Sequence, residues 1–527
     1  MKRILFIATT IIAPFLNAES INAEKQNNSA ADDFLNFQTK KFENKSILAQ
    51  PVSADEVKKL VRAGTKIELA ETIPLALKKN LGLSISRTNH AGTQESLEIA
   101  KADFDPTVSV SSNYTNTGTP YLRNQNHGSS TQLWTNEVAV SKKFETGTEA
   151  KVYADFNRQY NVSTEPDPAS GAAVGVEISQ PLLKNFGSEI NLASVVRAQK
   201  NITQSSLDLR KTTLDLIHDT ELAYWNLSAS YALVFARLSS LRYAEFVLEQ
   251  AKKKRSLKSA TKEEVLRAEA DVASRRVSLV SAKQAVQDAD DALRKLLGQD
   301  GTGTFEVYEV AALLNDIQSK MPEFQTWIKQ VRAFDIDAQI KQLEREKAEL
   351  DIKIAENNDK PSLDLVLGAE ANGRESSPHY AVGGIVDRTG YNLSAGVRFS
   401  MPIGFRAEKA ALRQAQRSRE SAQISIAQAE QNAMFSARAA WRSDEAARER
   451  LDASKTSFRM QYEAFEAQIA KYDVGACSIT DVLSAQDNLD SARLDLIQAA
   501  YDVATARAKI HRLDGRILSD YGYIWEE

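Results

Sequence analysis

The sequence is poor in the residues that several common classes of protein require. It holds one cysteine, Cys477, five histidines, 12 prolines and 22 glycines among 527 residues. A single cysteine excludes an internal disulfide framework and a cysteine-based zinc site, and five scattered histidines argue against a metal enzyme. Few prolines and glycines disfavour long disorder and favour long, uninterrupted elements. We therefore expect no metal site and no cofactor.

Neither sign of charge dominates the composition. The 66 basic and 70 acidic residues give a net charge of −4, so there is no basic excess for binding nucleic acid. The mean hydropathy of −0.38 excludes a polytopic helical membrane protein. Walker A, HExxH and nucleophile-elbow motifs are missing from the sequence, so nothing in it indicates an enzyme.

One long apolar run lies at the N-terminus. A basic start is followed by apolar residues 4–16 and then by small residues. This pattern is typical of a secretory signal peptide within residues 1–23, with cleavage after Ala18 or Ala23. The run is too short to span a bilayer, which needs about 20 residues. We expect an exported chain.

Two parts of the sequence resemble each other at a constant offset of 217 residues. Val265–Gly298 aligns without gaps with Val482–Gly515, and landmarks further upstream keep the same order in both halves. This pattern indicates an internal two-fold duplication. After the signal peptide we expect a first helix–strand–helix repeat at residues 67–298, a second such repeat at 324–515 and a C-terminal tail at 516–527. The N-terminal segment, residues 24–66, and the linker, residues 299–323, are expected to be equatorial, which means that they wrap the helices at mid-height.

Long helices are expected in both halves. Heptad spacing places apolar residues seven apart from Val265 to Leu293 and from Val482 to Ile510, and alanines follow three residues on. Such a stripe predicts nearly parallel packing of neighbouring helices at close distance. The expected helices are Leu69–Ala102, Ser188–Leu257, Thr261–Leu297, Phe324–Ala355, Ala407–Tyr472 and Ile479–Leu513.

Between the helices, apolar and polar residues alternate with the period of a strand. The runs 362–372 and 391–401 alternate clearly, and weaker runs surround Val110 and Val176. Their lengths are near the 9–11 residues that a tilted transmembrane strand needs. One chain supplies about four such strands, too few to enclose a lumen. Because open strand edges are not tolerated in lipid, the strands predict a homo-oligomer.

The first half is longer than the second in this strand region. Pro106 and Pro181 are 75 residues apart, whereas Pro361 and Pro402 are 41 apart. The excess contains two strand-like runs that form a hairpin. The hairpin either extends outward as a surface loop or adds strands to a barrel, and the first interpretation is favoured.

Taken together, the export signal, the duplicated halves and the stretch Tyr472-Asp-Val-Gly475 followed by Asp481-Val-Leu resemble the TolC family of outer membrane efflux proteins. The resemblance covers about residues 67–515. It implies a mostly α fold with a membrane β-barrel, in which long antiparallel helices form an α-barrel tunnel and short amphipathic strands, four from each subunit, close a trimeric barrel. It also implies a homotrimer in the cell outer membrane, with its helices in the periplasm.

The family resemblance further implies a function and its partners. The chain would be the passive, water-filled exit duct of a tripartite efflux or type I secretion system. It would dock a periplasmic adaptor protein and an inner-membrane pump or ATP-driven exporter, because the chain itself lacks a nucleotide-binding motif. The cargo (drug, metal, small molecule or protein) and the type of pump stay open.

Candidate site residues follow from the same resemblance. The channel entrance corresponds to Asp481, Glu264 and Tyr472, where three symmetric carboxylates would favour cations.

The adaptor-contacting turn corresponds to Val474, Gly475 and Ala476. In the first half Lys258 replaces the glycine, so the sequence pattern is lost there. Six basic residues make this first turn strongly positive, namely Lys252, Lys253, Lys254, Arg255, Lys258 and Lys262.

A different class of protein is the alternative. A non-channel exported coiled-coil protein, structural or adaptor, would account for the heptads but leaves the duplicated alternating strands unexplained.

Overall fold

The computed structural model describes residues 52–118, 130–161, 165–301, 303–307, 323–387 and 390–522. The expected signal peptide at residues 1–23 lies outside them. The chain forms two compact units, and each takes residues from both halves of the sequence. The first comprises residues up to Ser86, Arg210–Asp335 and the chain from Glu430, and the second comprises Arg87–Leu209 and Ile336–Ala429.

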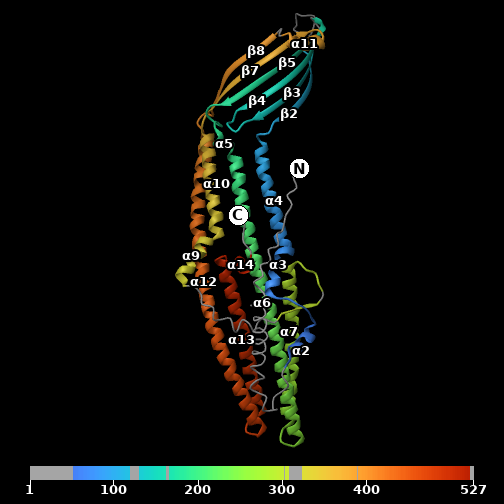
Figure 1. Cartoon of the computed structure of the whole chain (residues 1–527), viewed down its shortest axis with the longest axis vertical. Coiled ribbons are helices and arrows are strands. Elements are labelled where there is room, and N and C mark those ends of the chain that lie inside the picture. The colour runs from blue at the N-terminus through green and yellow to red at the C-terminus, as the bar shows by residue number, and fades with distance from the viewer. Residues whose placement is uncertain are drawn as a thin grey trace, which may run out of the picture. The chain divides into compact units, whose positions relative to one another are not determined.

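Helices dominate the first unit (Figure 1). Its elements are α2 (Ala54–Val61), β1 (Ala63–Lys66), α3 (Leu69–Lys79), α7 (Lys262–Leu297), β6 (Thr304–Glu306), α9 (Phe324–Phe334), α13 (Ile479–Leu513) and α14 (Arg516–Asp520), with parts of α6 (Ala193–Ser256) and α12 (Arg406–Asp473). The predicted heptad stripes of α7 and α13 are buried, because their side chains pack as knobs into holes on neighbouring helices.

Two segments that lack helical periodicity also pack into the first unit. Strand β1, from the expected N-terminal segment, pairs in parallel with β6, from the expected linker. Val57 and Phe305 are buried in one apolar cluster with α6 and α7. The described residues of these segments therefore pack against the helices.

Three predicted helices are each divided in two. Ser188–Leu257 is divided at Leu192 into α5 (Ser188–Asn191) and α6 (Ala193–Ser256). Leu69–Ala102 is divided at Asn80, whose backbone is extended and whose side-chain oxygen accepts a hydrogen bond from Leu83 N at 2.9 Å. Phe324–Ala355 is divided at Asp335. Short polar side chains that bond to nearby backbone compete with the helical hydrogen bonds, and this is the physical reason for the division at Asn80.

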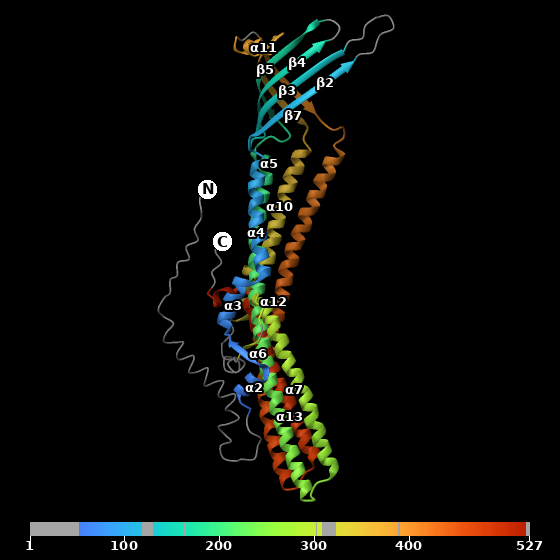
Figure 2. The ribbon, with the colours of Figure 1, turned by 90° about the vertical axis from the view of Figure 1, so that its right-hand side faces the viewer.

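The second unit holds one antiparallel sheet. It contains most of α4 (Leu81–Ala102), whose first residues to Ser86 belong to the first unit, and the remaining parts of α6 and α12. Its other elements are β2 (Thr107–Gly118), β3 (Ser130–Lys143), β4 (Glu149–Asn161), β5 (Glu165–Pro181), α5 (Ser188–Asn191), α10 (Ile336–Asn358), β7 (Ser362–Glu375), α11 (Pro378–Val386) and β8 (Gly390–Ser400). The strand order is β2-β3-β4-β5-β7-β8 (Figure 1), and Figure 2 shows the same sheet turned by 90°.

The favoured interpretation of the excess residues is wrong. Strands β3 and β4 lie inside the sheet between β2 and β5, and each pairs along nearly its whole length with its neighbours. The described part of the chain therefore supplies six strands to this sheet, rather than the four that were expected. The apolar alternation of β3 and β4 matches that of the neighbouring strands, so their side chains continue the same two faces of the sheet.

The two faces of the sheet differ in polarity. One face carries a band of apolar rows. Two of these rows run Val108, Val140, Val152, Val176, Ala369, Leu393 and Val110, Val138, Ala154, Val174, Ala371, Tyr391. The opposite face carries polar rows, such as Ser111, Glu137, Asp155, Ala173, Asn372. On this face Lys151 pairs with Glu137 at 2.8 Å.

Helix α11 covers one end of the sheet, where it packs on β5 and β7. Ala381 and Gly384 are its buried residues. A side chain at Gly373 of β7 would place its Cβ 2.2 Å from the Ala381 carbonyl oxygen, so only glycine permits this close approach. No helix in the described part of the chain is long and apolar enough to cross a lipid bilayer.

Candidate functional site

The predicted site residues lie at two helical hairpin turns of the first unit. The first turn joins α6 to α7 and the second joins α12 to α13. Lys258 and Gly475 occupy equivalent places, and both have left-handed backbone, with φ of 61° and 77°. Each turn closes with the same hydrogen bond, from Ser259 N to Lys254 O at 2.8 Å and from Ala476 N to Lys471 O at 2.8 Å. The first turn therefore keeps the backbone form although its sequence pattern is lost.

The carboxylate of Asp481 belongs to a helix cap. Ser478 Oγ accepts a hydrogen bond from Asp481 N at 3.3 Å, and the Asp481 carboxylate accepts one from Ser478 N at 2.9 Å. This reciprocal pair is a capping box. The Ser478 side chain and backbone hold the pKa of the Asp481 carboxyl below its usual range. The residue is exposed, so its charge still faces solvent.

Glu264 begins α7 in the equivalent position. Thr261 Oγ1 accepts a hydrogen bond from Glu264 N at 3.2 Å. The side chain is half-buried, unlike that of Asp481. Both acidic residues thus sit in the first turn of a helix, where the helix dipole favours negative charge.

Tyr472 is buried, unlike the two acidic residues. Its ring belongs to an apolar cluster built from α6, α7, α12 and α13, together with residues such as Phe465 and Val482. The Lys254 ammonium lies 3.5 Å from the ring centroid and donates a hydrogen bond to the Tyr472 carbonyl oxygen. Burial, with the nearby charge of Glu264, raises the pKa of the Tyr472 hydroxyl. Tyr472 therefore joins the two hairpins from the inside.

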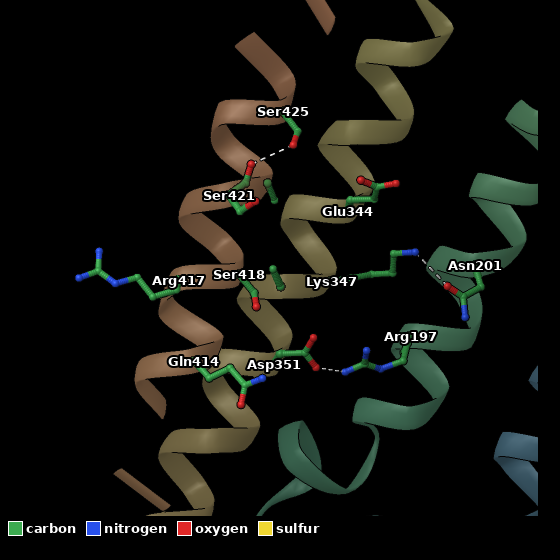
Figure 3. Close-up of a pocket in the computed structure, with 12 residues that line it drawn as sticks. Arg197, Asn201, Glu344, Lys347, Asp351, Gln414, Arg417, Ser418, Ser421 and Ser425 are labelled. Atoms are coloured by element: carbon green, nitrogen blue, oxygen red, sulfur yellow. Dashed lines mark hydrogen bonds and ion pairs between the residues drawn. The ribbon is translucent and has the colours of Figure 1, made fainter. Parts of the chain in front are cut away.

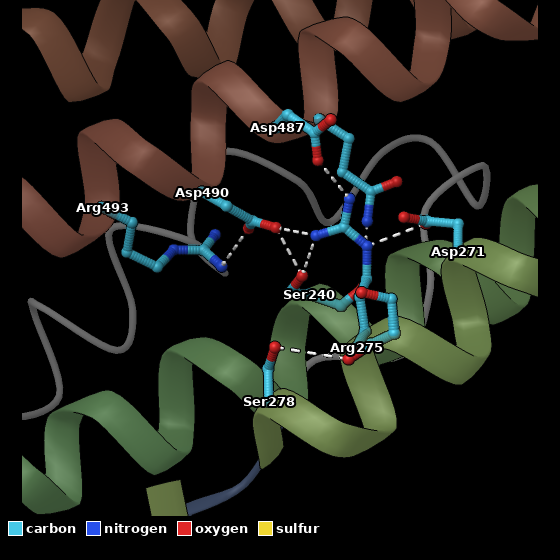
Figure 4. Close-up of polar contacts among 9 residues, drawn as sticks. Ser240, Asp271, Arg275, Ser278, Asp487, Asp490 and Arg493 are labelled. Atoms are coloured by element: carbon cyan, nitrogen blue, oxygen red, sulfur yellow. Dashed lines mark hydrogen bonds and ion pairs between the residues drawn. The ribbon is translucent and has the colours of Figure 1, made fainter. Parts of the chain in front are cut away.

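A buried polar network joins the same two hairpins further along (Figure 4). The Arg275 guanidinium of α7 donates to Asp271 on its own helix and to Asp487 of α13, both at 2.8 Å, and it also bonds to Asp490. Ser240 of α6 accepts from Arg275 and donates to Asp490. Both Arg275 and Asp490 are about 8% exposed. A buried guanidinium with several carboxylate partners fixes the orientation of the hairpins.

Sequence reasoning missed this network, although a signal was present. Arg275 interrupts a row of small residues, because the row in α7 runs Ala268, Arg275, Ala282, Ala289 and its counterpart in α13 runs Ala485, Ala492, Ala499, Ala506. A charged residue at a helix-packing position requires a buried partner. The partner, Asp490, could not be identified from spacing alone.

The basic residues of the first turn are partly neutralised within the unit. Lys252 pairs with Glu269 at 3.0 Å and Lys253 with Glu249 at 2.8 Å. Among the described residues no ion pair links this basic set to Glu264 or Asp481. Apolar side chains are also exposed at the turns, since Leu257 is 75% and Val474 81% exposed. Both turns thus expose one large apolar side chain.

The second unit contains a polar cavity of about 670 Å³ between α6, α10 and α12 (Figure 3). Arg197 donates to Asp351 there, and Lys347 donates to Asn201 at 3.2 Å. These two contacts join α6 to α10 across the cavity. No group of three or more metal-ligating side chains is found in the described ranges.

Comparisons with known proteins converge on one kind of molecule. The family model described as "Outer membrane efflux protein" matches residues 72–299 and 327–516. The curated outer membrane efflux protein BepC of Brucella suis is 22% identical over 372 residues, which is 68% of this chain and 76% of BepC.

Two solved structures share the fold. The CmeC outer membrane channel of Campylobacter jejuni is 16% identical with a TM-score of 0.63 and covers 92% of each chain. The outer membrane protein VceC of Vibrio cholerae is 15% identical with a TM-score of 0.62, over 88% of this chain and 98% of VceC.

Proposed function

The chain belongs to the outer membrane efflux protein family, and we propose that it is the outer membrane channel of a tripartite efflux or type I secretion system. It is placed in the outer membrane, and it forms a passive, water-filled exit duct from the periplasm to the exterior. Energy for transport comes from its partners, because the sequence has no Walker A motif.

The sheet of the second unit is the observation that carries this proposal. One of its faces carries a band of apolar rows that crosses all six strands, while the opposite face is polar. Each strand has at least the 9–11 residues needed to cross the hydrocarbon core. A sheet with these two faces fits lipid on one side and water on the other.

The functional molecule is proposed to be a homotrimer. A single sheet of six strands leaves its two outer strands with unpaired backbone groups, which lipid does not satisfy. Pairing with identical copies supplies the missing hydrogen bonds. The two sequence repeats, residues 67–298 and 324–515, then give the helical part of each subunit two similar hairpins.

The hairpin turns are the proposed contact with the adaptor. Val474, Gly475 and Ala476 form the contacting turn, and the exposed Val474 side chain supplies apolar surface. The adaptor would connect this turn to an inner-membrane pump or ATP-driven exporter. The exposed carboxylate of Asp481 and the half-buried carboxylate of Glu264 belong to the proposed channel entrance.

Tyr472 has a different proposed role at the entrance. It is buried between the hairpins, so it would act by holding them together rather than by contacting cargo.

Reconstitution tests the channel directly. The purified full-length protein should run as a heat-modifiable trimer from outer membrane fractions and should give discrete current steps in a planar lipid bilayer. A soluble monomer that carries no current would overturn the proposal. For the entrance, Asp481→Asn should lower the preference for cations. If the reversal potential in a salt gradient is unchanged, the assignment of Asp481 to the channel entrance is wrong.

A further inference from the structure

We propose that β3 and β4 are part of the membrane-spanning wall, so that the assembled duct is an eighteen-stranded ring with six strands from each of three copies. This inference rests on the proposed trimer but not on its contacts with other proteins. It assigns two surfaces that bind a second copy of the chain, namely the free edge of β2 and the free edge of β8.

The rows of side chains on both faces of the sheet continue through β3 and β4. Val108 of β2 is continued by Val140 of β3, Val152 of β4 and Val176 of β5. On the opposite face Ser111 is continued by polar side chains of β3 and β4. If the β3–β4 hairpin extended beyond the membrane, its valines and Trp134 would lie in water. These exposed apolar side chains are therefore expected to face lipid.

The side chains of the two outer strands, β2 and β8, are more exposed than those of the central strands. On the apolar face Val110 of β2 is 74% and Leu393 of β8 is 73% exposed, whereas Val176 in the central strand β5 is 41% exposed. Every residue of β2 is exposed. The difference is what a missing neighbour on one side produces, and a strand edge with free N–H and C=O groups is a template for pairing with another chain.

The direction of the strands allows this pairing without a reversal. All neighbours in the sheet are antiparallel, and the number of strands is even, so β8 runs opposite to β2. The β8 edge of one copy can therefore form an antiparallel ladder with the β2 edge of the next. Three copies give three times six, or eighteen, strands. Because barrel diameter grows roughly linearly with strand number, this ring is about 1.5 times as wide as one with four strands per copy.

Cysteine pairs test the edges. We would combine Ser111→Cys in β2 in turn with Asn392→Cys, Ser394→Cys and Arg398→Cys in β8, all on the polar face, and oxidise the purified trimer. At least one pair should give covalent dimers and trimers. Ser111→Cys with Asp364→Cys of β7 is the matched control and should give none. A trimer without any β2–β8 link would overturn the inference.

Lipid quenching tests the place of β3. A bimane label on Val138→Cys or Val140→Cys should be quenched several-fold more by brominated phospholipid than the same label on Glu137→Cys or Ser141→Cys, and iodide in water should show the reverse order. If all four labels respond to iodide alone in a protein that is still trimeric, β3 and β4 lie outside the wall. A monomer without current would instead overturn the proposed function, so the two failures are distinguishable.

A deletion measures the width of the ring. Thr115 of β2 and Ala169 of β5 lie in one row, joined through Leu133 and Gln159. Replacing residues 116–168 with Asn-Gly, a favoured hairpin turn, therefore joins β2 to β5 with their apolar side chains on one face. In electron micrographs the ring should narrow to about two thirds of its width. A trimer of unchanged width would contradict the proposal.

Discussion

The helical unit and the sheet unit place their charged and apolar residues in opposite ways. In the helical unit the charged residues Arg275 and Asp490 are buried between packed helices. In the sheet unit large apolar residues such as Leu393 are exposed along a whole face. The distribution of charged and apolar residues in each unit therefore suits the surroundings of that unit. The helices form their own interior in water, and the sheet uses lipid as the apolar phase that it lacks.

Removing a buried charge should have the largest effect. Arg275→Met removes the main cationic partner of the buried Asp490 carboxylate and leaves it only Arg493, whose guanidinium lies 3.9 Å away. Breaking a buried pair costs about 3–5 kcal/mol. We expect a loss of this size in the free energy of unfolding, measured by denaturant titration of the purified protein. The matched control is Arg276→Met, because Arg276 is largely exposed and pairs with Glu245 at 3.1 Å. That change should cost about 0–1 kcal/mol.

The double variant Arg275→Met with Asp490→Leu sharpens the test. It removes both charges together but leaves the buried Arg493 without its ion pair to Asp490, so part of the loss should be recovered. If Arg275→Met and Arg276→Met destabilise the protein equally, the interior of the helical unit does not depend on this network.

Adding a charge to the apolar face of the sheet should have the next largest effect. Leu393→Arg places a guanidinium among residues that face lipid, at a cost of about 2–4 kcal/mol near the middle of the bilayer. Less protein should reach the outer membrane as a heat-modifiable trimer. Ser394→Arg, one residue later on the polar face, is the control and should assemble normally. Equal losses in both variants would contradict the assignment of the two faces.

Much of this comparison could be predicted from the sequence. The heptads gave the helices α7 and α13 to within a residue, because their stripe is buried against other helices of the same chain. The alternation gave β7 and β8 for the same kind of reason, since a strand shows one face to each environment. Local pattern suffices where the environment of an element is uniform along its length.

Other features depend on partners that are distant in the sequence. Asn80 donates to Leu296 O at 2.8 Å, 216 residues away, and this contact supports the division of the first helix. The Arg275–Asp490 bond joins residues 215 apart. The position of β3 and β4 inside the sheet is likewise a matter of pairing rather than of pattern, because a hairpin in a loop and a hairpin in a sheet have the same alternation.

The two hairpin turns allow a smaller and more symmetrical test. Gly475→Lys forces a lysine into left-handed backbone at the second turn, and Lys258→Gly relieves the same strain at the first. We expect a loss of about 1 kcal/mol for the former and a gain of up to about 1 kcal/mol for the latter, measured as the free energy of unfolding. No heavy atom lies within 4 Å of a Cβ built at Gly475, so a clash cannot cause the loss. Changes of the same sign would show that the turns are not equivalent.

The smallest effect is expected at Asp481, which is charged but lies outside the interior of the helical unit. Its pKa is lowered because Ser478 donates to its ionised form, so the folded state binds a proton less readily than the unfolded state. The stability from this cap is therefore complete above the unfolded pKa, about 3.9, and is lost as the pH falls through the lower folded pKa. Asp481→Asn should be slightly less stable than the parent at pH 7, and this difference should shrink as the pH falls through the lowered folded pKa of Asp481. Unfolding curves of both proteins at pH 7, 4 and 3 measure it. A difference independent of pH would mean that the ionised carboxylate does not stabilise α13, and Ser478→Ala, which also removes the cap, should reproduce the loss at pH 7.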